Sequence, residues 1–364
     1  MKIKDFTNFL EDIAPLSLQE DYDNSGLIFG NYNDDVKGIL VTLDCTEEIV
    51  DEAINSNCNL IVSHHPLIFQ GIKKLNVNNY IHRTVIKAIK NNVAIYSMHT
   101  NLDNIILGVN SKICDRLNLV NCKILLPKKN SLRHLVFYSP HSHSLKIKEK
   151  LFSCGAGHLG AYSECSFSSK GIGSYKPLDN SNPFLGKKKK LHNQPEDRIE
   201  MLFPSNVEGK VIAALKKEHP YEEVAYQIYN IENKYHNIGS GMIGELKFPQ
   251  KPSDFLNDLK LKMKTNCIRY TTTNKNKVSK VAVCGGSGKF LLKHAIKEKA
   301  DIYISSDFKY HDFFEGENDI IIADIGHYES EQFTKELIYD LLIEKFPKFA
   351  IQISKHNTNP INYK

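Results

Sequence analysis

The first 120 residues alternate short apolar runs with segments of helical period. The apolar runs at residues 38–44, 59–63 and 93–98 predict three buried strands. Helical patterns follow them at about 46–55, 80–92 and 106–118. Strands and helices that alternate at this spacing predict a parallel sheet with right-handed crossovers.

The same alternation of strand and helix patterns returns near the end of the chain. Strands are expected at 280–286, 301–306, 319–325 and 349–354, and helices at 290–299 and 330–346. The sequence therefore predicts an α/β fold class with two similar α/β halves that together form one core.

The segment between these halves has a different pattern of apolar and polar residues. Residues 133–140, 198–204 and 222–231 resemble strands, and 207–220 an amphipathic helix, while 154–195 is rich in Gly, Ser and Pro with little periodicity. We therefore expect an inserted α+β module with its own sheet. The expected segments are 1–124 and 248–364 for the two halves and 125–247 for the insertion.

Composition narrows the class of protein. A chain of 364 residues with 41% hydrophobic content suggests two or three domains. No apolar run approaches the roughly 20 residues of a membrane span, and the amphipathic start lacks the features of a signal peptide. The eight cysteines form no C-x-x-C pair, which favours reduced thiols in the cytoplasm over a zinc ribbon or redox motif.

Charge gives little support for nucleic-acid binding. The formal net charge of +5 is small and spread along the chain. The basic run KKKK at 187–190 lies among Gly and Pro residues and is interpreted as a solvated loop, with phosphate binding as the less favoured alternative.

Imidazole and carboxylate groups collect where the expected strands end. In open parallel sheets this carboxyl edge is where ligands bind. The residues concerned are His64, His65, His99, Asp103, His327 and Glu331. Such groups are ligands for borderline divalent metals such as zinc, manganese or iron. The number of candidates exceeds one tetrahedral site and favours two metals about 3.5–4 Å apart, bridged by a carboxylate and a water.

Each motif alone also has an ordinary structural explanation. The pair HH can be an exposed turn, HTNLD a loop after a strand, and GHYESE an acidic helix start. The stretch CGGSGKF at 284–290 suits a phosphate-binding turn or tight strand-to-helix packing equally well. In SSDFKYHD, Asp307 and His311 are candidate acid–base or supporting groups, with surface polarity as the alternative.

The motifs taken in order resemble one family along nearly the whole chain. This is the Nif-three-like family, whose members are called GTP cyclohydrolase I type 2 homologues. The resemblance is carried by DYDNSGLIFG, VTLDCTEEIVDEAI, IVSHHPLIF, HTNLD, VAVCGGSG, SSDFKYHD and GHYESE, and in the middle by GAGHLGAYSECSF, NPFLG and HPYEEVAY. The middle motifs are similar to the inserted ferredoxin-like domain of the long bacterial members, which resembles the PII and CutA proteins. Where the family usually has tryptophan before DN, this chain has Tyr22, which keeps an aromatic side chain there.

The resemblance implies a dinuclear site with two divalent metal ions per chain. Its ligands would be His64, His65, Asp103, His327 and Glu331, with Glu331 bridging and His99 as a neighbour that can form a hydrogen bond with the bound water. It also implies a toroidal homohexamer whose metal sites face an internal cavity.

Three functions remain open at this point. The first is a metal-dependent hydrolase of GTP or a related nucleotide, in which water attacks C8 of the base and a formamide is then hydrolysed. The second is a two-metal phosphoesterase on nucleotides or nucleic-acid ends. The third is a non-enzymatic metal-binding or regulatory hexamer, which a PII-like insertion would suit.

Overall fold

The computed structural model describes residues 1–272 and 274–364, which separate into two compact units. The first unit comprises Met1–Pro127 and His236–Lys364, and the second comprises Lys128–Tyr235. These boundaries differ from the expected 125 and 247. Residues 236–247 belong to the first unit because most of them form a long strand, Gly239–Gln250, of its second sheet.

The first sheet of the first unit is mostly parallel, with the strand order β1-β4-β3-β2-β15. Only the edge strand β1 runs antiparallel to its neighbour. The strands are β1 (Gly26–Phe29), β2 (Ile39–Thr42), β3 (Leu60–Ser63), β4 (Ala94–Ser97) and β15 (Ile351–Ile353). The three strands expected from the N-terminal apolar runs are therefore confirmed.

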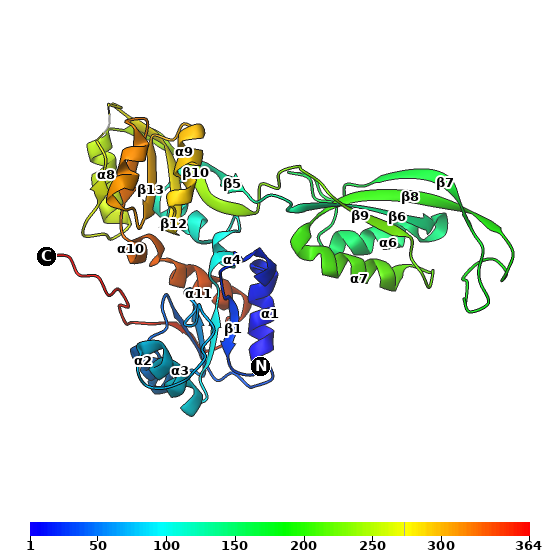
Figure 1. The fold of residues 1–364 in the computed structure, drawn as a ribbon, viewed down its shortest axis with the longest axis horizontal. Helices are drawn as coiled ribbons and strands as arrows, with labels where there is room; N and C mark the ends of the chain where they lie inside the picture. The colour runs from blue at the N-terminus through cyan, green and yellow to red at the C-terminus, as the bar shows by residue number, and fades with distance from the viewer. Residues whose placement is uncertain (273) are drawn as a thin grey trace. The chain divides into compact units, whose positions relative to one another are not determined.

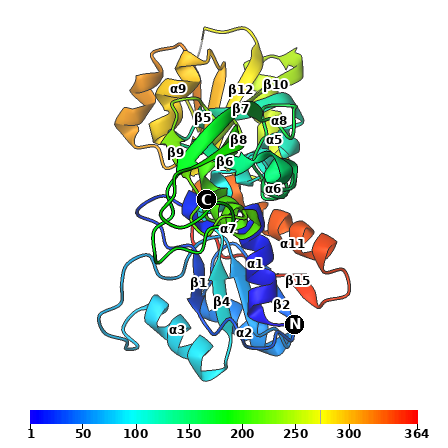
Figure 2. The ribbon, with the colours of Figure 1, turned by 90° about the vertical axis from the view of Figure 1, so that its right-hand side faces the viewer.

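Helices cover both faces of this sheet because its central strands are buried on both sides. The helices of this region are α1 (Ile3–Ile13), η1 (Leu16–Leu18), α2 (Glu47–Asn55), α3 (Tyr80–Lys90), α4 (Thr100–Asp103) and α5 (Val109–Leu117). Helices α2 and α3 bury Ile49 and Val85 in the same core as Leu40 and Ile61. Figure 1 shows α1 on one side of this sheet and α2 and α3 on the other. Helix α11 (Thr334–Lys345) packs against β2 and β15 (Figure 2).

The second sheet has the order β11-β14-β13-β12-β10-β5. Strands β12, β13 and β14 are parallel, and β10 and β5 continue the sheet antiparallel. The strands are β5 (Leu119–Pro127), β10 (Gly239–Gln250), β11 (Arg269–Tyr270), β12 (Val278–Ser287), β13 (Ile302–Ser306) and β14 (Ile321–Asp324).

Short helices follow these strands. They are α8 (Pro252–Lys262), η3 (Lys289–Leu291), α9 (Leu292–Lys297), η4 (Tyr310–Gly316) and α10 (His327–Glu331). The helix expected at 330–346 is two helices, since α10 ends at Glu331 and α11 begins at Thr334. In Figure 1, α4 and α10 lie between the two sheets of the first unit.

The second unit is one antiparallel sheet with two helices on one face. Its strands have the order β7-β8-β6-β9. Along the chain the elements are β6 (Leu132–Pro140), α6 (His141–Ser153), β7 (Phe167–Tyr175), β8 (His192–Pro204), η2 (Ser205–Val207), α7 (Glu208–Glu218) and β9 (Tyr226–Asn230). The helices bury Ile147 and Leu215 against Phe137 and Phe203.

Strand β7 lies in the stretch that we expected to have little periodic structure. Its residues are exposed or half-buried throughout, so no apolar alternation marks it in the sequence. The protein as a whole is a mixed α/β fold with several sheets. Among the described residues, no helix is long and apolar enough to cross a membrane.

Candidate metal centre

His64 and His65 follow β3 at a turn that places their rings side by side. The amides of both residues donate to the carbonyl of Leu43, and the Ser63 hydroxyl donates to the carbonyl of His65 at 2.8 Å. The backbone therefore leaves the strand geometry that would send neighbouring side chains to opposite faces. The two ring centroids lie 4.9 Å apart.

The next strand end supplies His99 and Asp103. His99 follows β4 and begins α4, and Asp103 is the last residue of that single turn. The His99 ring centroid lies 5.3 Å from that of His64 and 5.5 Å from that of His65.

The second sheet supplies His327 and Glu331 from α10, which follows β14. Their spacing of four residues places both on one helix face, and His327 Nε2 lies 3.1 Å from Glu331 Oε2. Gly286, near the end of β12, packs directly against Glu331. A Cβ at Gly286 would lie 2.4 Å from Glu331 Oε1, so the close approach requires glycine.

The Glu331 carboxylate lies close to histidine side chains that follow strands of both sheets. Its Oε2 lies 2.9 Å from His65 Nε2, and its Oε1 lies 3.8 Å from His64 Nε2. His64 Nε2 is also 3.8 Å from Asp103 Oδ1. Three groups of potential ligand atoms result, each within 4.8 Å: His65–His327–Glu331, His64–Asp103–Glu331 and His64–His65–His99.

Every imidazole of the cluster is held through Nδ1, which leaves Nε2 facing inward. His64 Nδ1 lies 2.7 Å from the Met98 carbonyl. The other three rings each have a carboxylate oxygen 2.7 Å from Nδ1; the pairs are His65–Asp44, His99–Asp23 and His327–Asp307. Such partners fix the tautomer and the ring orientation of metal-binding histidines.

Two buried polar atoms at the centre have no hydrogen-bond partner among the described residues: His64 Nε2 and Asp103 Oδ1. A carbonyl only accepts hydrogen bonds, so His64 Nδ1 carries the proton and Nε2 offers a lone pair. Burial lowers the pKa of His64, which keeps the ring neutral. A lone pair facing two carboxylates at 3.8 Å is unfavourable unless a cation lies between them.

The donor set fits a divalent transition metal. Nitrogen and oxygen ligands lie about 2.1 Å from such an ion, so two of them are separated by at most about 4.2 Å. The spacing of 3.8 Å between His64 Nε2 and either carboxylate oxygen lies inside that limit. Imidazole and carboxylate together suit zinc, manganese and iron.

The remaining pKa values describe the protein without a metal ion. Burial alone would lower the pKa of His65, but hydrogen bonds to Asp44 and Glu331 raise it to about 10. For His327 the Glu331 charge and the Asp307 hydrogen bond likewise outweigh burial and raise the pKa to about 11. Burial, with the nearby Glu331 charge, raises the pKa of Asp103. A cation that binds Nε2 of His65 or His327 therefore displaces a proton, and binding tightens as the pH rises.

The structure brings together all five sequence-predicted ligand candidates and His99. Asp307 lies next to them through its bond to His327, whereas His311 packs its ring against Tyr310 and Phe314 on η4 and belongs to none of the three groups. Sequence reasoning missed Asp44 and Asp23, the carboxylates behind His65 and His99. Asp44 lies just beyond β2, so the rule that polar groups gather at strand ends would have found it.

The two glycines near the end of β12 have a packing role. Their amides are engaged by side chains, since Gly285 N–H donates to Asn110 and Gly286 N–H donates to Ser330. Of the two explanations for CGGSGKF, this favours tight packing over a phosphate-binding turn at these two amides.

Comparison with known proteins yields relatives over the full length. A family model described as Duf34/NIF3 (NGG1p interacting factor 3) matches residues 1–360. A GTP cyclohydrolase 1 type 2 homolog of Bacillus subtilis strain 168 is 37% identical over 359 residues, covering 97% of this chain and 96% of the relative. A homolog of the same name from Halalkalibacterium halodurans is 36% identical, covering 96% and 95%. The crystal structure of a Bacillus cereus protein related to NIF3 superposes with a TM-score of 0.87 at 33% identity, covering 100% of this chain and 99% of that one.

Proposed function

Because this chain belongs to the Duf34/NIF3 family, we propose that it is a metal-dependent hydrolase whose centre holds two divalent cations. The observation that carries the proposal is the position of Glu331. Its two oxygens face different groups, Oε2 toward His65 and His327 and Oε1 toward His64. A carboxylate placed in this way is suited to bridge two ions.

The ligands divide naturally between the two cations. His65, His327 and Glu331 would hold one, and His64, Asp103 and Glu331 the other. Asp44 and Asp307 would keep the first pair of rings oriented through their Nδ1 atoms.

The reaction needs an activated water and a group that accepts its proton. Two bound cations would lower the pKa of water between them and polarise the oxygen of a substrate. His99 is the candidate proton acceptor, because its ring lies beside His64 and His65 and Asp23 occupies its Nδ1. Thr100 donates two hydrogen bonds to the other oxygen of Asp23 and so fixes that carboxylate behind His99.

We propose GTP or a related nucleotide as the substrate. The support is the shared name of the relatives, GTP cyclohydrolase 1 type 2 homolog. Addition of water to C8 opens the imidazole ring of the base, and hydrolysis of the resulting formamide consumes a second water and releases formate.

A two-metal phosphoesterase is the second candidate. The observation in its favour is the pair of ligand groups that share Glu331, because two-metal sites commonly catalyse displacement at phosphorus. Its products differ, since it would release phosphate or a dephosphorylated nucleotide in place of formate.

The second unit is proposed to be a ferredoxin-like module of the PII and CutA type. Its element order β-α-β-β-α-β and its fully antiparallel sheet support this assignment. We further propose that the protein assembles as a toroidal homohexamer, the assembly implied by the family resemblance, in the cytoplasm.

The test is a hydrolysis assay with protein that has been freed of metal and reloaded with zinc, manganese or iron. Formate and phosphate released from GTP and other nucleotides are measured separately. His99→Gln should keep the metal content and lower kcat by about 10²–10⁴-fold, the usual contribution of a general base. His158→Gln, a change at an exposed histidine of the second unit, should match the parent protein.

Loaded protein that releases neither product from any nucleotide would contradict the proposal and favour the non-enzymatic alternative. Equal rates for His99→Gln and the parent protein would exclude His99 as the proton acceptor.

A further inference from the structure

A cavity opens over η3 and the start of α9, which follow strand β12. Its volume is about 540 Å³, and it is lined by Ser287, Lys289, Phe290, Lys293 and Glu315. This volume lies within the range of sites for a single small molecule. Ser287 follows Gly286 along the chain, and Gly286 is the residue against which Glu331 packs.

The backbone at the end of β12 is held in place by the neighbouring strand. The hydroxyls of Ser305 and Ser306 donate to the carbonyl of Gly286, at 2.9 and 2.6 Å. The Tyr303 hydroxyl donates to the carbonyl of Gly288 at 2.6 Å. Strand β13 therefore fixes the backbone from Gly286 to Gly288, which leads from β12 into the residues that line the cavity.

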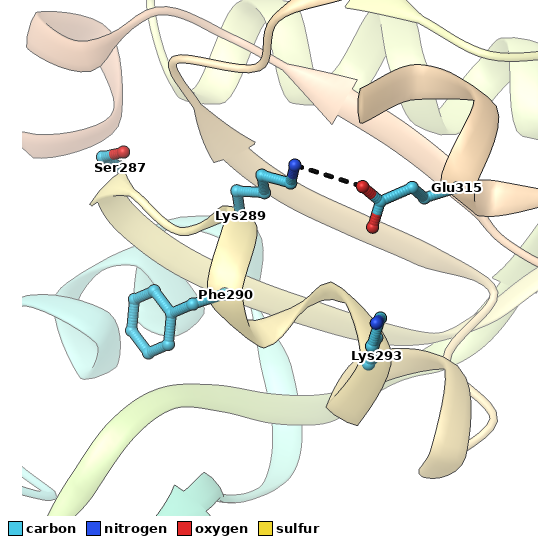
Figure 3. Close-up of a pocket in the computed structure, with 5 residues that line it drawn as sticks. All are labelled: Ser287, Lys289, Phe290, Lys293 and Glu315. Carbon is cyan, nitrogen blue, oxygen red and sulfur yellow. Dashed lines mark ion pairs between the residues drawn. The ribbon is translucent and has the colours of Figure 1, made fainter. Parts of the chain in front are cut away.

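Two of the lining side chains, those of Lys289 and Glu315, form an ion pair with each other. The Lys289 ammonium lies 2.5 Å from Asp312 and 3.1 Å from Glu315, so its charge is compensated within the protein. Figure 3 shows the Lys289–Glu315 pair across the cavity. This pair is a poor candidate for binding an anion.

Phe290 and Lys293 are different, because neither has a partner among the described residues. The Phe290 side chain is 58% exposed and makes no ring contact, and Lys293 is exposed with no ion pair in the described part of the chain. They are three residues apart across η3 and α9, a spacing that puts two side chains on the same helical face. An exposed ring and an uncompensated cation on one face are the groups that stack a base and bind a phosphate.

We infer that this cavity binds a nucleotide, with its base against Phe290 and its phosphates at Lys293. In Figure 3, Ser287 and Phe290 lie at one end of the lining residues, and Lys293 and Glu315 lie at the other. The inference rests on the proposed function for its substrate class.

The experiment measures binding to metal-free protein, so that it does not depend on hydrolysis. Equilibrium dialysis with GTP and with guanosine is carried out on the parent protein, Phe290→Ala and Lys293→Gln. Phe290→Ala should weaken both ligands about tenfold or more, because both have a base to stack. Lys293→Gln should weaken GTP about fivefold or more and leave guanosine unchanged, because only GTP has phosphates.

The matched controls are Lys297→Gln, on the same helix, and Phe248→Ala, whose side chain is 73% exposed on β10. Both should bind like the parent protein. Circular dichroism checks that every variant is folded.

The inference is overturned if the parent protein binds neither ligand, or if Lys293→Gln weakens guanosine as much as GTP. It is also overturned if both site variants bind GTP like the controls. Binding as expected in a protein that hydrolyses nothing would keep the nucleotide site and refute the proposed reaction, so the two failures are distinguishable.

Discussion

Replacing Gly286 by alanine tests whether this glycine shapes the metal centre. Gly286 has a φ of +62°, and a Cβ there would lie 2.4 Å from Glu331 Oε1 and 3.3 Å from His327 Cε1. Ordinary contact begins near 3.4 Å, so the Glu331 carboxylate would have to move by about 1 Å. Metal ligands tolerate deviations of only about 0.2 Å.

Two effects are expected from Gly286→Ala. The left-handed backbone conformation costs an alanine about 1–2 kcal/mol in the free energy of unfolding. The displaced carboxylate should in addition lower the metal content, because both proposed ion positions use Glu331. Metal content per chain is measured by mass spectrometry, and stability by denaturant unfolding of metal-free protein.

Gly160→Ala separates these effects. Gly160 has a nearly identical φ of +58°, but no atom of the described residues lies within 4 Å of the position its Cβ would take. This control should lose a similar amount of stability through backbone strain and keep its metal. A Gly286→Ala protein with the full metal content of the Gly160→Ala protein would refute the argument.

Two further predictions concern modularity and assembly. Replacing residues 128–235 by a short linker should leave a folded first unit that binds metal. The reasons are that Pro127 and Gly239 are already partners in the β5–β10 ladder, and that all candidate ligands lie in the first unit. A folded product without metal would show that the second unit orders the site. The full chain should run as a homohexamer in light scattering, as the family resemblance implies, and a stable monomer at micromolar concentration would contradict that assembly.

The strands and the ligand candidates were predictable because both leave local signals. Buried parallel strands are short apolar runs, and the residues that follow them gather at one sheet edge. His64, His327 and Glu331 could be selected on this basis, although 266 positions separate His65 from its contact Glu331.

Other features leave no local signal. Strand β7 pairs with β8, yet every residue in it is exposed or half-buried, so its pattern lacks buried positions. The unit boundary after Pro127 depends on which strands pair, and β10 joins β5 across more than 100 intervening residues. Asp23 lies outside any strand end and becomes relevant only when folding places it 2.7 Å from His99.

The most direct test of the account is the metal content of Glu331→Gln. Glutamine has nearly the same volume as glutamate, but its amide is neutral and offers one good donor oxygen in place of two. Bridging therefore predicts that occupancy falls from about two ions per chain toward one or none, while circular dichroism shows a folded protein.

His65→Asn should lower occupancy as well, whereas Lys189→Gln, at an exposed lysine of the second unit, should retain about two ions. The measurement is metal stoichiometry by mass spectrometry on the three variants and the parent protein. A folded Glu331→Gln protein that keeps two ions per chain would contradict the bridging role of Glu331 and, with it, the proposed centre.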